Sequence, residues 1–441
     1  MRRLSPPTRL RGTMADWRTF SATSYRPFRL LAVAQGFIGA LSGPAILIPL
    51  LLALGAHPAL ATVLAVLPVL GTTVQRLIPR LLDRTDGNLR GLVVLFATIG
   101  EPRGLLLGGV VALAASGLVP HGVAIALIAL LMGGMGSLGA IGYGVLQSWY
   151  QIVLPDAERR LVAPRLAGIT LGIGSIVLLP LALTIDAVVA RIGLWAYCIP
   201  LAAGGTAGLV AAVAVRRLPS PGRVRVPRRT DADPPPDERL RGLARVLMLA
   251  SLAGGLSPFL SVYAIAVLGT GPGFAIAISA VSSGALVLSS LLVSSHLVRG
   301  SSSRLLRASQ LLRGGGLLLG LAAHPANPAS GIVLLVVAVL LAAGDAAGQL
   351  SANERLFRLA TGPSVIAFQS RFVVHNVVAY SIGLVVGSGV MLIGGYPAFA
   401  ILFGSAGLAR FGAARATEVS RPGVSTATSV MHVPGGDQPR E

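Results

Sequence analysis

Five polar residues interrupt the long apolar runs of this 441-residue chain at positions suited to chemistry: Glu101, Arg103, Asp345, His375 and Asn376. Ionisable side chains at membrane depth are costly, so they mark functional sites by default. Glu101 follows Arg90 by eleven residues, which is about 16 Å along a helix and near the middle of a bilayer core about 30 Å thick. Because a low-dielectric surrounding favours the neutral form of a carboxyl group, Glu101 is our candidate for binding and releasing a proton.

Arg103 follows Glu101 by two residues, about 200° around a continuous helix, so the two side chains are expected to meet different neighbours. Asp345 precedes Arg355 by ten residues and lies about 15 Å deep by the same count. We therefore predict an ion pair between Asp345 and Arg103 that leaves Glu101 to carry the proton. Two alternatives remain open: a span that starts near Gly104 leaves Glu101 and Arg103 as a solvated pair among headgroups, and any ion pair of Asp345 can be purely structural.

His375 and Asn376 lie one turn inside Arg371, where a hydrogen bond to a backbone carbonyl competes with a role in proton relay. The run G-M-G-S-L-G at 134–139 has the spelling of a dinucleotide-binding motif, but it lies inside an apolar run and not between a strand and a helix. The glycines at 133, 136, 139 and 142 instead predict a groove for close helix packing. The chain has no lysine, Ser/His/Asp grouping, carboxylate pair or H-E-x-x-H. We predict no enzyme activity, no cofactor and no metal site.

The composition predicts an integral membrane protein. Apolar residues make up 54% of the chain, charged residues only 12%, and the mean hydropathy is +0.77, whereas charge approaches a quarter in soluble domains. All 36 basic residues are arginines, and the net charge is +20. They lie mostly in short loops between apolar runs, so they indicate membrane orientation and not nucleic-acid binding. The single cysteine, Cys198, excludes an internal disulfide.

The apolar runs predict an all-α fold of twelve membrane-spanning helices, each near the ~20 residues that cross the hydrocarbon core. We place them at 29–54, 59–78, 91–113, 122–146, 166–185, 193–215, 246–268, 273–294, 305–323, 330–351, 366–390 and 395–411. The predicted domains are a basic tail (1–28), a six-helix bundle (29–215), a linker (216–245), a second bundle (246–411) and a disordered tail (412–441). Because 34 of the 36 arginines fall on one side of this map, we expect both termini in the cytoplasm of a bacterial plasma membrane.

The two halves repeat in one direction. Residues of the first span and its exit recur 214 positions later: Pro44, Leu54, Gly55 and Pro58 correspond to Pro258, Leu268, Gly269 and Pro272, and Arg90 to Arg304. Further along the chain the offset becomes 206, which pairs Arg165 with Arg371. An even number of helices in each copy makes the copies parallel, an arrangement that places a substrate site near the midplane between them.

The turn from Pro79 to Arg90, P-R-L-L-D-R-T-D-G-N-L-R, resembles the loop between helices 2 and 3 of major facilitator superfamily transporters, G-x-L-x-D-R-x-G-R-R. Pro79 stands at the first glycine, the second glycine comes one residue late, and one arginine follows it. The resemblance implies a conformational latch formed by Asp83 with Arg84 and Arg90. The alternative is a turn whose arginines only hold it in the cytoplasm. The second copy, at 296–304, lacks the acid.

This resemblance implies a secondary active transporter whose two bundles rock around a small-molecule site, with protons as an open choice of coupling ion. The expected partners are a small-molecule substrate and membrane lipids, without nucleic acid, and the expected state is a monomer. The alternative is a non-transporting membrane scaffold or lipid-handling protein with the same fold. The substrate and the direction of transport stay open.

Overall fold

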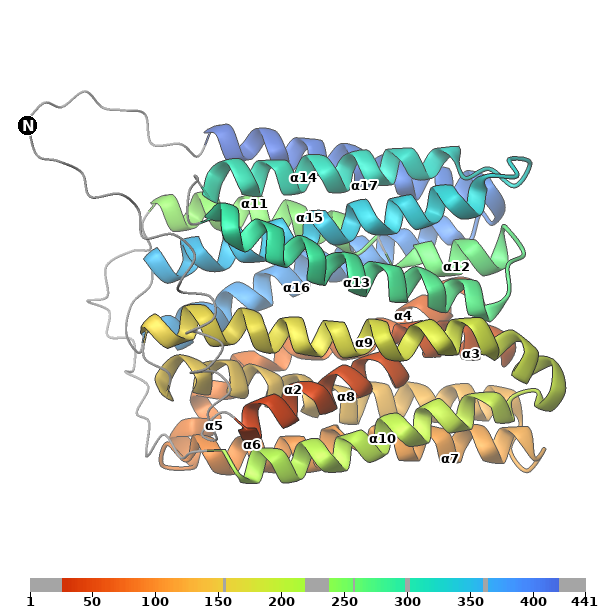
Figure 1. Ribbon diagram of the computed structural model, residues 1–441, viewed down its shortest axis with the longest axis horizontal. Coiled ribbons are helices and arrows are strands. Elements are labelled where there is room, and N and C mark those ends of the chain that lie inside the picture. The colour runs from red at the N-terminus through yellow and green to blue at the C-terminus, as the bar shows by residue number, and fades with distance from the viewer. Residues whose placement is uncertain are drawn as a thin grey trace, which may run out of the picture.

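The structure is a computed structural model that describes residues 26–153, 156–218, 238–256, 258–297, 302–359 and 364–419. These residues form helices joined by short turns (Figure 1). The N-terminal half contains α2 (Arg26–Leu41), α3 (Pro44–Ala53), α4 (Pro58–Gly71), the 3₁₀ helix η2 (Thr72–Leu77), α5 (Ile78–Arg84), α6 (Leu89–Gly100), α7 (Arg103–Ala115), α8 (His121–Val153), α9 (Asp156–Ile192) and α10 (Trp195–Arg216).

The C-terminal half contains α11 (Glu238–Gly254), α12 (Phe259–Ala266), α13 (Pro272–Leu297), α14 (Ser302–Leu319), η3 (Gly320–Ala322), α15 (Ser330–Leu359), α16 (Ser364–Met391) and α17 (Gly395–Val419). Within the described residues, eleven segments are long and apolar enough to cross a membrane. The remaining span, α14, carries three arginines and packs between α15 and α17. The predicted all-α membrane fold is confirmed, and the chain is a multi-pass membrane protein.

Several helices extend beyond the predicted spans. Helix α9 runs from Asp156 to Ile192, and α17 continues to Val419 past the predicted end at residue 411. Helix α11 begins at Glu238, inside the predicted linker. The extensions of α11 and α17 pack on their own half: Leu243 of α11 is buried with Leu306 of α14, and Ala416 of α17 packs against them. Hydropathy alone underestimates such helices because their ends are amphipathic and not uniformly apolar.

Three spans are broken near their middle, and one of these breaks lies between Gly254 of α11 and Phe259 of α12. The first span divides at Ser42 and Gly43, before Pro44, and the third divides at Glu101 and Pro102. A proline lacks the N–H that continues a helix and clashes with the preceding turn. At Gly43 a Cβ atom would lie 2.1 Å from the carbonyl oxygen of Gly39, so this turn requires glycine. Membrane helices tolerate such breaks where neighbouring helices cover the freed backbone groups.

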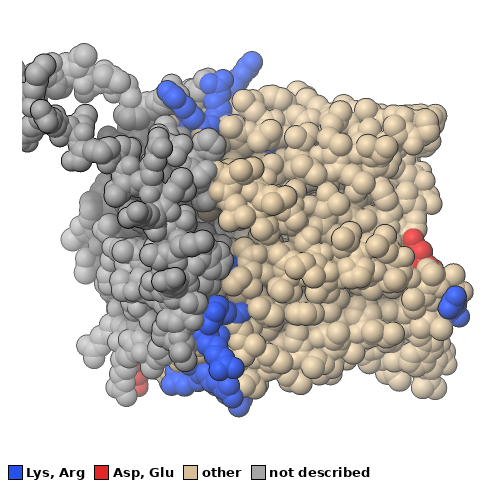
Figure 2. Space-filling model, viewed as in Figure 1, with Lys and Arg blue, Asp and Glu red and all other residues tan. Residues whose placement is uncertain are grey.

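The molecule has two distinct ends. The arginine-rich end is the end that carries the α5–α6 turn and the last turn of α10, and Figure 2 shows its basic residues as a band. The opposite end carries the turns α3–α4, α9–α10 and α12–α13. The largest apolar core joins both halves and includes Ile46 and Leu50 of α3 with Phe259 and Tyr263 of α12, all fully buried. Helix α3 contacts α12, which fixes this junction at the opposite end.

Toward the arginine-rich end, each half has a separate core among the described residues. One contains Leu89 and Val145 of the N-terminal half, and the other contains Leu243 and Leu306 of the C-terminal half. Figure 1 shows α9 and α13 approaching each other toward the end of α13 next to α12 and separating toward the arginine-rich end. The described residues therefore join the halves most fully at the opposite end.

Candidate functional site

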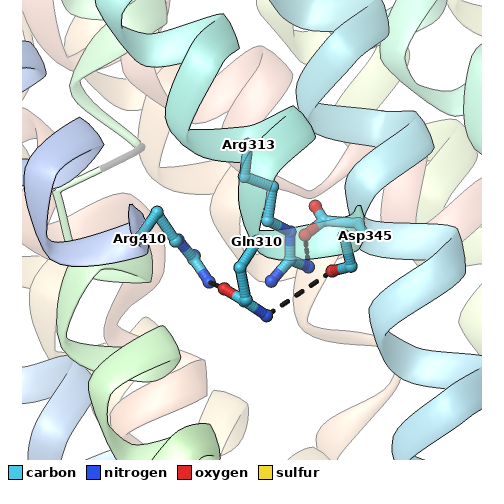
Figure 3. A network of polar contacts seen from close by, with 5 residues as sticks. Gln310, Arg313, Asp345 and Arg410 are labelled. Atoms are coloured by element: carbon cyan, nitrogen blue, oxygen red, sulfur yellow. Dashed lines mark hydrogen bonds and ion pairs between the residues drawn. The ribbon is translucent and has the colours of Figure 1, made fainter. Parts of the chain in front are cut away.

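A polar cluster lies inside the C-terminal half at membrane depth (Figure 3). Arg313 of α14 donates from Nη2 to Oδ1 of Asp345 on α15, and the two form an ion pair. Arg410 of α17 donates from Nη1 to Oε1 of Gln310 on α14, with a distance of 3.0 Å. The Nε2 group of Gln310 points to Ser309 Oγ, 3.5 Å away. Three helices thus meet through charged and amide groups, which we call the arginine cluster (Gln310, Arg313, Asp345 and Arg410).

Small residues on α15 bring the cluster together. Gly344 and Gly348, four residues apart, face α14 on either side of Asp345. A Cβ atom at Gly344 would lie 2.6 Å from Cγ of Arg313, and one at Gly348 would lie 2.6 Å from Oγ of Ser309. This is the small-residue spacing that allows membrane helices to approach closely. The run A-A-G-D-A-A-G therefore supplies both the close contact and the acid.

The arginine cluster has more positive than negative charge. It contains two guanidinium groups and one carboxylate, because Gln310 is neutral. Arg410 is 4% exposed, the side chain of Arg313 is 12% exposed, and that of Asp345 is 44% exposed. Among the described residues, Nε of Arg313 and Nε of Arg410 have no hydrogen-bond partner. Buried donors without acceptors are rare in folded proteins and call for an explanation.

Asp345 lies on the side of α15 opposite a stripe of exposed apolar residues. The exposed apolar residues of α15 (Ile332, Val336 and Val339) form one stripe. Asp345 lies about 180° around the helix from Val336 and shares its face with the exposed Gln349, one turn closer to the arginine-rich end. A charged side chain at membrane depth faces the bundle interior or a water-filled space. Asp345 therefore borders the interior of the molecule on the side that leads to the arginine-rich end.

Glu101 and Arg103 flank the break in the third span. Nη1 of Arg103 donates to the carbonyl oxygen of Gly100 at 3.2 Å, and a Cβ atom at Gly139 of α8 would lie 3.3 Å from the same nitrogen. The Arg103 guanidinium acts electrostatically on the half-buried Glu101 carboxyl group. The expectation of different neighbours agrees with the described contacts: Arg103 Nη1 lies against Gly139 of α8, whereas the Glu101 carbonyl group lies against Gly208 of α10. The alternative start near Gly104 is wrong, because α6 precedes the break with twelve residues.

The predicted ion pair between Arg103 and Asp345 is wrong. Asp345 pairs with Arg313, a residue that the sequence interpretation had assigned to a helix end. Arg313 instead lies eleven residues inside α14, about 16 Å from its start. The offset of 206 residues that relates Arg165 to Arg371 also relates Gly139 to Asp345. Arg103 thus faces a glycine at the repeat position where Arg313 faces an acid.

The other predicted residues lie elsewhere. Asp83 and Arg84 are exposed in the last turn of α5, and Asp86 and Gly87 make the following turn with φ values of 49° and 74°. Arg90 donates from Nη2 to the carbonyl oxygen of Arg216, which ties α6 to the end of α10 within one half. The proposed latch stays a prediction.

On α16, His375 is exposed and Asn376 is half-buried. The Oδ1 atom of Asn376 has no donor among the described residues. The glycine groove on α8 is confirmed: Gly136 lies against Pro68 of α4, and Gly142 lies against Phe96 of α6.

The sequence interpretation missed Asp186. Its Oδ1 atom accepts a hydrogen bond of 2.7 Å from the backbone N–H of Gly273, at the start of α13. Asp186 belongs to α9 and Gly273 to the other half, so this contact bridges the halves at the opposite end. A Cβ atom at Gly273 would lie 2.4 Å from the carbonyl oxygen of Ala182, which requires glycine there. Two features of the sequence could have indicated this contact. Asp186 is an isolated acid within an apolar run, and the Pro-Gly start of α13 has backbone N–H groups that need a hydrogen-bond acceptor.

Close packing of α10 positions the break that carries Glu101. A Cβ atom at Gly208 would lie 2.3 Å from the Glu101 carbonyl oxygen, whereas one at Gly109 of α7 would meet nothing within 4 Å. We expect Gly208→Ala to lower the free energy of unfolding by about 1–3 kcal/mol through overpacking. Gly109→Ala, the matched control, should be neutral or stabilising because alanine favours helix. Thermal melts of the purified proteins measure both, and equal stability of the two variants would contradict this packing.

Comparison with known proteins identifies the fold. No family model matches the chain, and a search of curated proteins finds no match. Solved structures do match. The xylose transporter XylE from E. coli, in a partially occluded inward open conformation, superposes with a TM-score of 0.64 at 13% identity, over 90% of this chain and 97% of that one. FucP, a major facilitator superfamily transporter in the outward conformation, superposes with a TM-score of 0.59 at 14% identity, over 90% of this chain and 99% of that one. The chain has the major facilitator fold.

The nucleoside transporter NupG (D323A mutant) is similar to the same extent, with a TM-score of 0.62 and 14% identity over 90% of this chain and 99% of that one. The major facilitator fold confirms the resemblance that the Pro79–Arg90 turn suggested. XylE is described as a xylose transporter and NupG as a nucleoside transporter. The fold therefore indicates the arrangement of the helices and leaves the substrate to the residues of this chain.

Proposed function

We propose that this protein is a secondary active transporter that moves a small molecule across the bacterial plasma membrane by alternating access. The junction between the halves carries this proposal. The apolar core and the Asp186–Gly273 hydrogen bond join the halves at the opposite end, while the described cores at the arginine-rich end are separate. A transporter needs a junction that closes at one end while the other opens.

We assign the arginine-rich end to the cytoplasm, with both termini there, because positively charged loops are retained on that side. The core that the two halves share among the described residues then lies toward the outside. Asp345 and Gln349 border the interior on the cytoplasmic side and mark the substrate path. We expect the transporter to act as a monomer within the membrane lipids, because each chain contains both halves of the junction.

Glu101 is proposed as the proton carrier. It lies at the break between α6 and α7, near the middle of its span, and Arg103 is the charged group that acts on it. In the C-terminal half, Asp345 already forms an ion pair with Arg313, so we assign the proton to Glu101 and not to Asp345. This division of roles supports proton coupling through the N-terminal half.

Flux into proteoliposomes tests the transport proposal. Vesicles containing the purified protein and vesicles lacking protein are incubated with a mixture of bacterial metabolites, and their contents are compared by mass spectrometry. We expect at least one compound to accumulate only in the protein-containing vesicles. No difference across metabolites, pH gradients and membrane potentials would favour the alternative, a non-transporting scaffold or lipid-handling protein.

A further inference from the structure

We propose that the arginine cluster binds the carboxylate of a singly charged organic anion, which makes the transported substrate a monocarboxylate. This inference rests on the proposed transport function, because it names the substrate class for the same interior. It goes beyond the fold, since the structural relatives differ in what their descriptions say they transport. The charge of the cluster, its unpaired donors and its exposure support this substrate class.

The charge of the cluster favours one additional negative group. Arg313 and Arg410 carry two positive charges, and Asp345 supplies one negative charge. Arg410 is close enough to act electrostatically on Arg313, so the two guanidinium groups repel each other. Inside a membrane such an excess is costly, and a partner of opposite charge removes the cost. A monocarboxylate neutralises the cluster, whereas a phosphate with a charge of about −1.5 to −2 would overcompensate it.

The hydrogen-bonding groups of the cluster also fit a carboxylate. A guanidinium group has five N–H donors in a rigid fork that matches the two oxygens of a carboxylate. The Nε donors of Arg313 and Arg410 lack acceptors among the described residues. Arg410 makes its described side-chain hydrogen bond to the neutral amide of Gln310 and not to an acid. The cluster therefore has donor capacity left for an oxyanion.

A substrate would reach the arginine cluster through the partly exposed side chains of Arg313 and Asp345. The Arg313 side chain is 12% exposed and the Asp345 side chain 44%, whereas Arg410 is 4% exposed. The substrate carboxylate would share the Arg313 guanidinium with Asp345, entering along the face that carries Gln349. Arg410 acts as a positioning residue: its charge creates the excess that attracts the anion, and its hydrogen bond to Gln310 orders α14 beside Arg313.

Matched pairs of acids and amides test this assignment. The purified full-length protein is melted with acetate, benzoate or nicotinate and with acetamide, benzamide or nicotinamide, at constant ionic strength in chloride. We expect at least one acid to raise the melting midpoint by about 2 °C or more while its amide does not. Arg410→Gln, which leaves a neutral Arg313–Asp345 pair, should remove the shift. Arg410→Lys, which keeps the charge, should retain most of it, and melts without ligand verify that both variants fold.

Three results would overturn the proposal: no acid stabilises the protein, whether or not inorganic phosphate does; an amide acts as strongly as its acid; or the acid effect persists in Arg410→Gln. The flux assay separates this inference from the transport proposal. Flux of neutral or cationic compounds without acid binding removes the monocarboxylate and leaves a transporter, whereas acid binding without any flux supports the site and contradicts transport.

Discussion

Asp345→Asn protein should fold poorly and accumulate in the membrane at a small fraction of the wild-type level. The substitution removes the carboxylate that pairs with Arg313 and leaves the charges of Arg313 and Arg410 without a described acidic partner. Removing one partner of a buried ion pair costs about 3–5 kcal/mol. Because the Asp345 side chain is 44% exposed, we expect a cost near the lower end, about 3 kcal/mol. Size-exclusion profiles and thermal melts of the solubilised protein measure the loss.

A second substitution distinguishes charge from packing. Arg410→Gln in the Asp345→Asn background removes one of the two uncompensated charges and should recover part of the lost stability. Asp86→Asn, at an exposed turn with a positive φ that asparagine tolerates, is the matched control and should be neutral. Normal stability of Asp345→Asn protein would show that the ion pair does not support the fold, and the role assigned to the arginine cluster would need another basis.

Glu101→Gln protein should lose accumulation driven by a pH gradient but retain counterflow exchange of the same substrate. Exchange needs only the movement of the two halves, whereas accumulation needs a group that releases its proton on one side. Glutamine preserves the size and hydrogen bonding of the side chain but cannot ionise. Uptake with and without an imposed pH gradient, using the compound identified in the flux assay, measures the two modes separately.

Arg103→Gln and Asp86→Asn serve as comparisons in the same assay. Arg103 is the charged group that acts on Glu101, so its loss should alter the pH dependence of uptake without removing the proton site. Asp86→Asn should leave both modes unchanged. Gradient-driven accumulation that survives in Glu101→Gln protein would exclude Glu101 as the carrier and would indicate a facilitator without proton coupling.

The fold was predictable from the sequence because the bilayer sets the length and apolar character of each membrane-spanning helix. Each span needs about 20 apolar residues, and that length is visible in the composition of every run. The helix breaks at Gly43 and Pro102 were only partly foreseen. Pro44 marked the first break, but the third span was taken as continuous although Pro102 interrupts it. The ends of α9, α11 and α17 were underestimated because arginines within amphipathic turns resemble loop residues.

The site was less predictable because partners in a membrane protein come from different helices. The sequence identified Asp345 as an intramembrane acid but not Arg313, whose neighbours Arg304 and Arg307 resemble helix-end charges. Arg410 was excluded for the same reason, since it lies close to the last predicted residue. The spacing of Gly344 and Gly348 around Asp345 was the available signal. Such small-residue spacing predicts a close helix neighbour, and α14 is that neighbour.

In alternating access, one end of the molecule closes as the other opens. Pairs of spin labels on cysteines introduced into a Cys198→Ala background measure the distance between the two halves at each end. Leu118→Cys with Ala326→Cys, both exposed, spans the halves at the opposite end, and Arg80→Cys with Arg415→Cys spans them at the arginine-rich end. Asp186→Ala removes the hydrogen-bond acceptor for the Gly273 N–H. Because a helix cap contributes ~1 kcal/mol, the equilibrium constant for opening at the opposite end should rise about fivefold.

The decisive measurement compares both label pairs in wild-type and Asp186→Ala protein by double electron–electron resonance. The account predicts reciprocal changes in the Asp186→Ala protein: a longer population between residues 118 and 326, and a shorter one between residues 80 and 415. Distances that stay fixed at both ends, or that lengthen together, would contradict an alternating-access transporter.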